Sequence, residues 1–120
     1  MTVFDHEKLE AYQVATQALA LGVRITRRIP NEDRFLRNQL LRALTSMCFN
    51  LAEGSGEFSP GDKVRFSRMS RRSASESAAI TDALRLLEYV NNDDARALKD
   101  LLSRVTAMLT RLIQSRNPAA

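Results

Sequence analysis

The apolar residues of this chain recur at steps of three and four along almost its whole length. That spacing is typical of one face of an α-helix, whereas a half-buried strand alternates strictly between apolar and polar residues. The clearest run consists of Ala95, Leu98, Leu102, Val105, Leu109 and Leu112. Because no segment alternates with a period of two, the pattern predicts an all-α protein.

Three breaks divide the helical pattern into four parts. Pro30 ends the first helix, because a proline disfavours the helical conformation of the residue before it. Gly54 is a natural C-terminal cap for the second helix, and Ser59-Pro60 is a typical start for the third. The predicted helices span residues 6–28, 32–53, 60–90 and 94–114. Short connections favour antiparallel neighbours, so residues 1–120 are predicted to form a single up-down-up-down four-helix bundle.

The first helix is apolar over more than one face. Its main stripe and the residues that widen it are Leu9, Tyr12, Leu19 and Val23, then Ala15, Ala18, Leu21 and Ile25. A surface helix of a monomer needs only one buried face. The width of this stripe therefore favours a homo-oligomer.

A line of small and polar side chains borders the apolar face of the second helix. Ala43, Ser46, Asn50 and Glu53 follow one another at helical steps. The third helix carries a heptad-like seam of Phe66, Met69, Ser73, Glu76, Ile80, Ala83, Leu87 and Val90. We expect a hydrogen-bonded network that fixes the pairing of the two helices, made by Ser46, Asn50, Glu53, Ser73 and Glu76. A ligand or partner pocket at the same place is the alternative.

Basic residues dominate two stretches of a chain whose net charge is +4. One cluster on the third helix contains Arg65, Arg68, Arg71 and Arg72, and a second contains Arg24, Arg27, Arg28, Arg34 and Arg37. Arginine favours bidentate contact with phosphate or carboxylate groups. The clusters predict salt-dependent binding to the backbone of RNA or DNA. The alternative is a protein-interaction scaffold whose arginines pair with an acidic partner or with neighbouring subunits.

Signatures of catalysis and of metal binding are sparse in this sequence. One histidine, His6, and one cysteine, Cys48, are too few for a Ser-His-Asp relay or a closed zinc site of cysteine type. Glu53 and Glu76 are the only candidate acid–base pair, and they lie on separate helices. We expect a protein that is not an enzyme and needs no cofactor or metal. The first residues lack the pattern of a secretory signal and no apolar run approaches a membrane span, so we expect a cytoplasmic location.

Several segments resemble bacterial four-helix bundle proteins related to the 23S rRNA intervening-sequence protein. The resemblance covers residues 4–112 and rests on Gln39–Ser46, Asn50–Gly56, Arg65-Phe66, Ser73, Glu76 and the Pro30 break. It implies a bundle that assembles into a ring-like homopentamer and has no established enzymatic activity. A similar branch, the accessory variability determinant of diversity-generating retroelements, is a basic pentamer that binds nucleic acid and a reverse transcriptase. RNA binding and docking to a partner protein are the functions that the resemblance implies.

The chain departs from this family just before Ser73. Ser70-Arg71-Arg72 stand where small or apolar residues are common in the family. The added charge close to the seam argues for a looser helix contact at this place. The alternative is that it strengthens a surface for an anionic partner.

Overall fold

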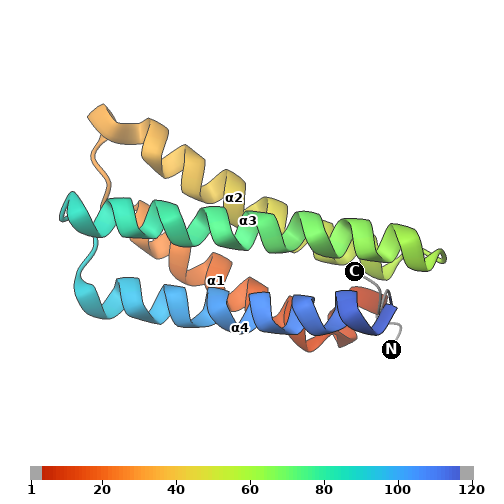
Figure 1. Cartoon of the computed structure of the whole chain (residues 1–120). Coiled ribbons are helices and arrows are strands. Elements are labelled where there is room, and N and C mark those ends of the chain that lie inside the picture. Colours follow the sequence, from red (N-terminus) through yellow and green to blue (C-terminus); the bar gives the residue numbers. More distant parts are fainter. Residues whose placement is uncertain (1–3, 117–120) are drawn as a thin grey trace.

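Four α-helices make up nearly all of the computed structural model, which describes residues 4–116 (Figure 1). The helices are α1 (Glu10–Thr26), α2 (Arg34–Ser55), α3 (Pro60–Leu86) and α4 (Asn92–Arg116). Two short 3-10 turns, η1 (Asp5–Lys8) and η2 (Asn31–Asp33), precede α1 and α2. No strand occurs in this part of the chain, which confirms the all-α prediction.

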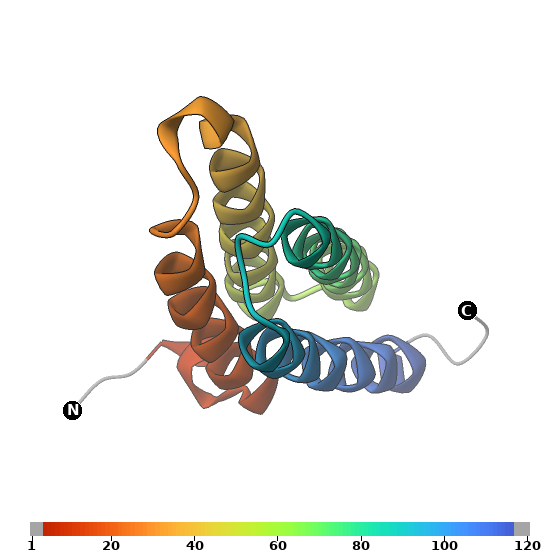
Figure 2. The ribbon, with the colours of Figure 1, turned by 90° about the vertical axis from the view of Figure 1, so that its left-hand side faces the viewer.

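The helices follow one another around a shared core, seen along the bundle in Figure 2. α2 packs on α1 and on α3, and α4 packs on α3 and closes against α1. Consecutive helices are antiparallel, so the start of α3 lies beside the end of α4 (Figure 1). No helix within residues 4–116 has both the length and the apolar character needed to cross a membrane.

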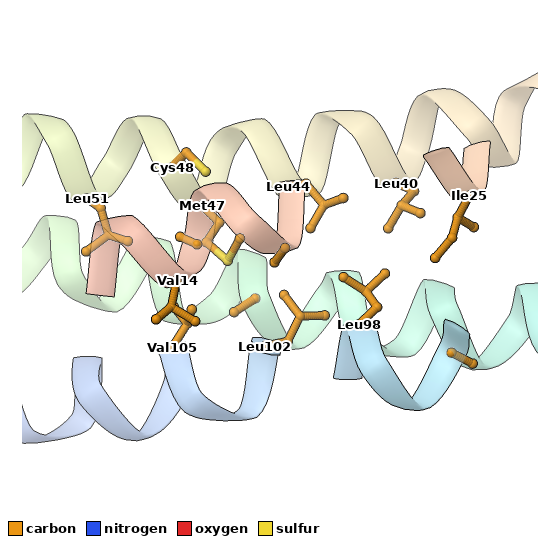
Figure 3. Packing of buried hydrophobic residues seen from close by; sticks show 14 of the residues in the cluster. Val14, Ile25, Leu40, Leu44, Met47, Cys48, Leu51, Leu98, Leu102 and Val105 are labelled. Atoms are coloured by element: carbon orange, nitrogen blue, oxygen red, sulfur yellow. The ribbon is translucent and has the colours of Figure 1, made fainter. Parts of the chain in front are cut away.

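The core is built mainly from leucine, isoleucine, valine, methionine and alanine side chains of α1, α2 and α4 (Figure 3), and α3 adds Ala74 and Leu84. On α4, the predicted heptad positions Ala95 to Leu109 are all buried, and Leu112 packs at the edge. Gly22 allows α1 to approach α2 closely, because a Cβ there would lie 2.2 Å from Cδ1 of Leu44. Cys48 is buried in the same core, and burial raises the pKa of its thiol to about 11.

The end of α3 differs from the prediction, because the helix stops at Leu86 instead of continuing to residue 90. The N–H of Tyr89 donates to the carbonyl of Leu84 at 2.9 Å, and the N–H of Glu88 donates to that of Arg85 at 3.0 Å. These two bonds form a Schellman motif, in which Glu88 takes a left-handed conformation with φ 65°. The apolar pattern continues past this stop, which is why periodicity alone predicted a longer helix. Smaller differences are the start of α1 at Glu10 after a separate 3-10 turn, and α4 bounds of Asn92–Arg116.

The buried line of α3 is not the predicted seam. Met69, Glu76 and Leu87 are exposed. Most of the buried side chains on this helix are serine or threonine, and the full set is Val64, Ser67, Ser70, Ser73, Ala74, Ser77, Thr81 and Leu84. Small side chains allow close contact between helices, and hydroxyl groups remain satisfied there by bonding to backbone carbonyls.

Ser70 marks this close contact between α2 and α3. Its Oγ donates to the backbone carbonyl of Met47 across the interface at 2.7 Å. Nearby, a Cβ on Gly54 would lie 2.9 Å from Cβ of Phe66. The expectation of a looser contact beside Ser70-Arg71-Arg72 is therefore wrong, because Ser70 faces α2 while Arg72 is exposed to solvent.

Candidate nucleic-acid interface

One end of the α3/α4 pair is basic, with Asp62 in the first turn of α3 as its one acidic residue within the two helices. Residues 63–75 of α3 and residues 101–116 of α4 contain no Asp or Glu. Their basic residues are Lys63, Arg65, Arg68, Arg71 and Arg72 on α3, and Arg104, Arg111 and Arg116 on α4. Because the two helices are antiparallel, these stretches lie at the same end of the bundle (Figure 1). The fold thus concentrates positive charge that the sequence distributes over two distant segments.

Five arginines line a continuous groove at this end. A hollow of about 600 Å³ lies among Pro60, Gly61, Val64, Arg65, Arg68, Met69, Arg72 and Arg116. A neighbouring hollow of about 380 Å³ shares two of these residues and lies among Arg68, Arg71, Arg72, Ser75 and Thr106. We call Arg65, Arg68, Arg71, Arg72 and Arg116 with these two hollows the arginine groove. It is an open channel on the surface, which suits an extended anion better than a small enclosed one.

The helical spacing of α3 sets the positions of these guanidinium groups. Arg65, Arg68 and Arg72 follow steps of three and four, so they lie along one face of the helix over about 10 Å. Arg71 points toward α4, where its Nη1 donates to Oγ1 of Thr110 at 3.2 Å. The guanidinium of Arg65 lies over the ring of Phe66, with Cζ 4.4 Å from the ring centroid.

Little negative charge neutralises the arginine groove. In the described part of the chain, its one intramolecular ion pair joins Arg65 to Asp62 at 3.7 Å, and both side chains are about half exposed. An exposed pair of this length contributes little and is easily exchanged for another anion. The N-terminus of α3 adds partial positive charge beside Pro60 and Gly61, which line the groove. The groove is therefore arranged to attract anions.

The second arginine cluster lies at the other end of the bundle, around the connection between α1 and α2 (Figure 1). Arg28 forms an ion pair with Asp94 of α4. Arg37 donates to the carbonyl of Ile29 at 3.4 Å and to Oδ1 of Asn31 at 3.2 Å. Arg34 donates to the carbonyl of Asn31 at 3.4 Å, whereas Arg24 and Arg27 are exposed on α1. The structure does not bring the two clusters together, and Arg28, Arg34 and Arg37 of the second one hold the chain connection in place.

Three of the five residues expected in a polar network do contact one another. Nδ2 of Asn50 donates to the carbonyl of Ser46 at 2.9 Å and to its Oγ at 3.1 Å. The hydroxyl of Ser73 on α3 donates to the same Oγ at 3.0 Å. Glu53 on α2 and Glu76 on α3 are exposed instead. On α3 the buried hydroxyl residues are others, among them Ser70, Ser73 and Ser77. Within residues 4–116 no cluster of His, Cys, Asp and Glu side chains suits a metal ion.

Arg116 is the groove residue that sequence reasoning missed. It lies 44 positions beyond Arg72 in the chain, yet both line the same hollow. The signal that could have found it is the antiparallel pairing of α3 and α4, which places two acid-free stretches side by side.

Comparison with known proteins identifies a family and a similar fold. Residues 7–111 match the family model described as 23S rRNA-intervening sequence protein. The fold is similar to the 1.70 Å crystal structure of a protein of unknown function from the S23 ribosomal protein family of Bacteroides thetaiotaomicron. That match has a TM-score of 0.74 and 21% sequence identity, and covers 88% of this chain and 99% of the other. At this identity it supports the shared fold alone, and no match is found among curated proteins.

Proposed function

We propose that this chain, which belongs to the 23S rRNA-intervening sequence protein family, is a non-catalytic protein that binds RNA through its arginine groove. The contacts are made to the phosphate backbone, and the groove arginines are the binding residues. We place this activity in the cytoplasm, as the sequence predicts.

The observation that carries the proposal is the scarcity of carboxylates beside the groove arginines: in the described part of the chain, the one ion pair that a groove arginine makes is that of Arg65 with Asp62. Arginines that serve only as solvated helix residues are usually interspersed with acidic ones, as at the other end of this bundle. There Arg28 pairs with Asp94, and Lys99 pairs with Asp82 at 2.8 Å. In the groove the guanidinium groups instead face an open channel, which favours a polymer with regularly spaced anions.

An acidic protein is the alternative partner for the same arginines. Both kinds of partner lose affinity as salt rises, so salt dependence alone does not separate them. Competition with an unrelated nucleic acid separates the two kinds of partner. Such a competitor displaces RNA from a phosphate-binding groove but leaves a specific protein partner bound. A partner that stays bound in the presence of excess unrelated nucleic acid would therefore indicate protein binding.

We also propose that the chains assemble into a homo-oligomer, in the ring-like homopentamer that the sequence resemblance implies. What supports assembly is the surface of α1 and α2. Residues 11–23 and 43–52 contain no charged residue, and the two helices pack against each other. Phe49 lies in the second of these stretches with 66% of its surface exposed. Uncharged surfaces with exposed aromatic residues are typical of subunit interfaces, and this one leaves the groove on α3 and α4 open.

The test of RNA binding is fluorescence anisotropy of a labelled RNA across a salt series. We expect log-linear loss of affinity with salt, and a shallower slope by about one unit for each phosphate contact removed. Arg68→Ala/Arg72→Ala removes two groove arginines, and Arg24→Ala/Arg27→Ala removes the same charge from exposed positions at the other end. Weaker binding in the first variant alone supports the groove. Equal effects of both pairs, or no binding at low salt, would contradict it.

A further inference from the structure

We propose that the arginine groove takes a strand whose bases are unpaired, and that the ring of Phe58 stacks on a base at one end of it. This inference rests on the proposed function, and it specifies the kind of nucleic acid that the site accepts. Phe58 is then a specificity-determining residue, which favours single strands over duplexes.

The exposure of Phe58 is the first observation. Its side chain is 98% exposed, more than any other large hydrophobic residue in the described part of the chain. An aromatic ring that is almost wholly exposed adds little to the core, so folding stability gives little reason for it. A role in contacting another molecule does give one.

The position of Phe58 is the second observation. It lies in the connection between α2 and α3, two residues before Pro60, which lines the arginine groove. Two residues span at most about 7 Å, so the backbone of Phe58 lies near the mouth of the groove. The connection is short and held at both ends. Oγ of Ser59 accepts the N–H of Asp62 at 3.3 Å, and the N–H of Gly56 donates to the carbonyl of Glu53 at 3.2 Å.

The size of the groove fits a short stretch of one strand. From Pro60 to Arg72 the helix rises about 18 Å, which corresponds to roughly five phosphates at the rise of a stacked strand. Phe66, the other aromatic residue nearby, is covered by the guanidinium of Arg65. Of Phe58 and Phe66, Phe58 is thus the one whose ring is free.

The chemistry of the two groups explains the preference for unpaired bases. Every base has a π-face on which an aromatic ring can stack, and this face is accessible only when the base leaves the duplex. A duplex offers phosphates to the arginines but no base to Phe58. The arginines therefore bind both single strands and duplexes, whereas the ring of Phe58 contacts single strands alone.

The sequence permits a direct test, because the chain contains no tryptophan. Phe58→Trp makes the stacking residue the sole fluorescent tryptophan, and Phe35→Trp is the matched control. Phe35 is also exposed, at 59%, but it lies at the start of α2, at the other end of the bundle. We expect an unpaired RNA oligonucleotide to quench the tryptophan at position 58 and not the one at position 35. The same oligonucleotide annealed to its complement should quench neither.

Affinity gives the second readout. Phe58→Ala should weaken binding of the unpaired oligonucleotide by about 5- to 150-fold, as expected for the loss of one stacked base, and leave duplex binding unchanged. If Arg68→Ala/Arg72→Ala weakens binding while Phe58→Ala does not, and no quenching occurs, the stacking inference is overturned and the proposed function stands. If neither RNA binds the wild-type protein, both fail.

Discussion

Glu88 shows how a single residue sets the end of a helix. It has a φ of 65°, where a side chain bearing a Cβ is strained and glycine is not. We expect Glu88→Gly to raise the free energy of unfolding by about 1 kcal/mol, measured by urea denaturation. Glu88→Ala is the control, since it removes the carboxylate and keeps the strain. Equal stabilisation by both variants would show that the charge of Glu88, and not its backbone conformation, limits stability.

Because of Cys48, we expect the free energy of unfolding to change with pH in the alkaline range. Burial raises the pKa of its thiol from 9.0 to about 11, so the neutral thiol is favoured in the folded state. As pH rises, the Cys48 thiol ionises in the unfolded chain before it does so in the folded one. Its contribution to the free energy of unfolding is therefore fully present below pH 9 and is lost as pH rises toward 11. Cys48→Ala removes this dependence, which is on the order of 2 kcal/mol for a shift of this size. Unfolding free energies of the two proteins that stay parallel from pH 8 to about 11 would contradict this account.

At the scale of the elements, the contact between α2 and α3 depends on small side chains. Oγ of Ser70 lies 2.7 Å from the carbonyl oxygen of Met47, which leaves no room for extra methyl groups. We expect Ser70→Val to lower the free energy of unfolding by about 1–3 kcal/mol through overpacking and the lost hydrogen bond. Ser75→Val, at an exposed position of the same helix, should change it by less than about 0.5 kcal/mol. Similar losses of unfolding free energy in the two variants would indicate that valine lowers the helix propensity of α3, and not that it disrupts the contact with α2.

The same contact explains which parts of the fold the sequence could predict. The α4 seam was predicted correctly because its buried residues are also its large apolar ones, such as Leu98 and Leu102. The α3 seam was predicted wrongly because close packing selects Ser70 and Ser77 over larger residues such as Met69. Hydropathy therefore pointed to the wrong face of α3. The all-α class and the family were also predicted correctly, since both rest on local spacing and on continuous motifs.

The candidate site was predicted in fragments for a related reason. The arginines of α3 form a visible cluster in the sequence, whereas Arg116 joins them only through tertiary structure. In the second cluster, Arg28 looks available in the sequence, but the fold pairs it with Asp94 of α4. The sequence shows where charges lie along the chain. Only the packing of helices shows which of them face each other.

At the scale of the whole molecule, the uncharged and the arginine-rich stretches lie on different helix pairs, and we assign one of the two proposed functions to each. The uncharged stretches 11–23 and 43–52 lie on α1 and α2, and the arginine groove lies on α3 and α4. A protein that assembles through the first pair presents one groove per subunit. Several linked grooves on one long RNA bind more tightly than a single groove does, without any new contact.

Phe49→Glu tests this division because it places a charge in the middle of the uncharged surface, at a position that is exposed in the single chain. We expect a lower mass by size-exclusion chromatography with light scattering, while circular dichroism shows that the helices persist. Phe35→Glu, outside the uncharged stretches, should leave the mass unchanged. Affinity for a long RNA should then fall in Phe49→Glu, and affinity for an oligonucleotide that fills one groove should stay the same, because separation of the subunits removes only the linkage between grooves. A wild-type protein that is monomeric, or a mass unaffected by Phe49→Glu, would show that α1 and α2 are not the assembly surface.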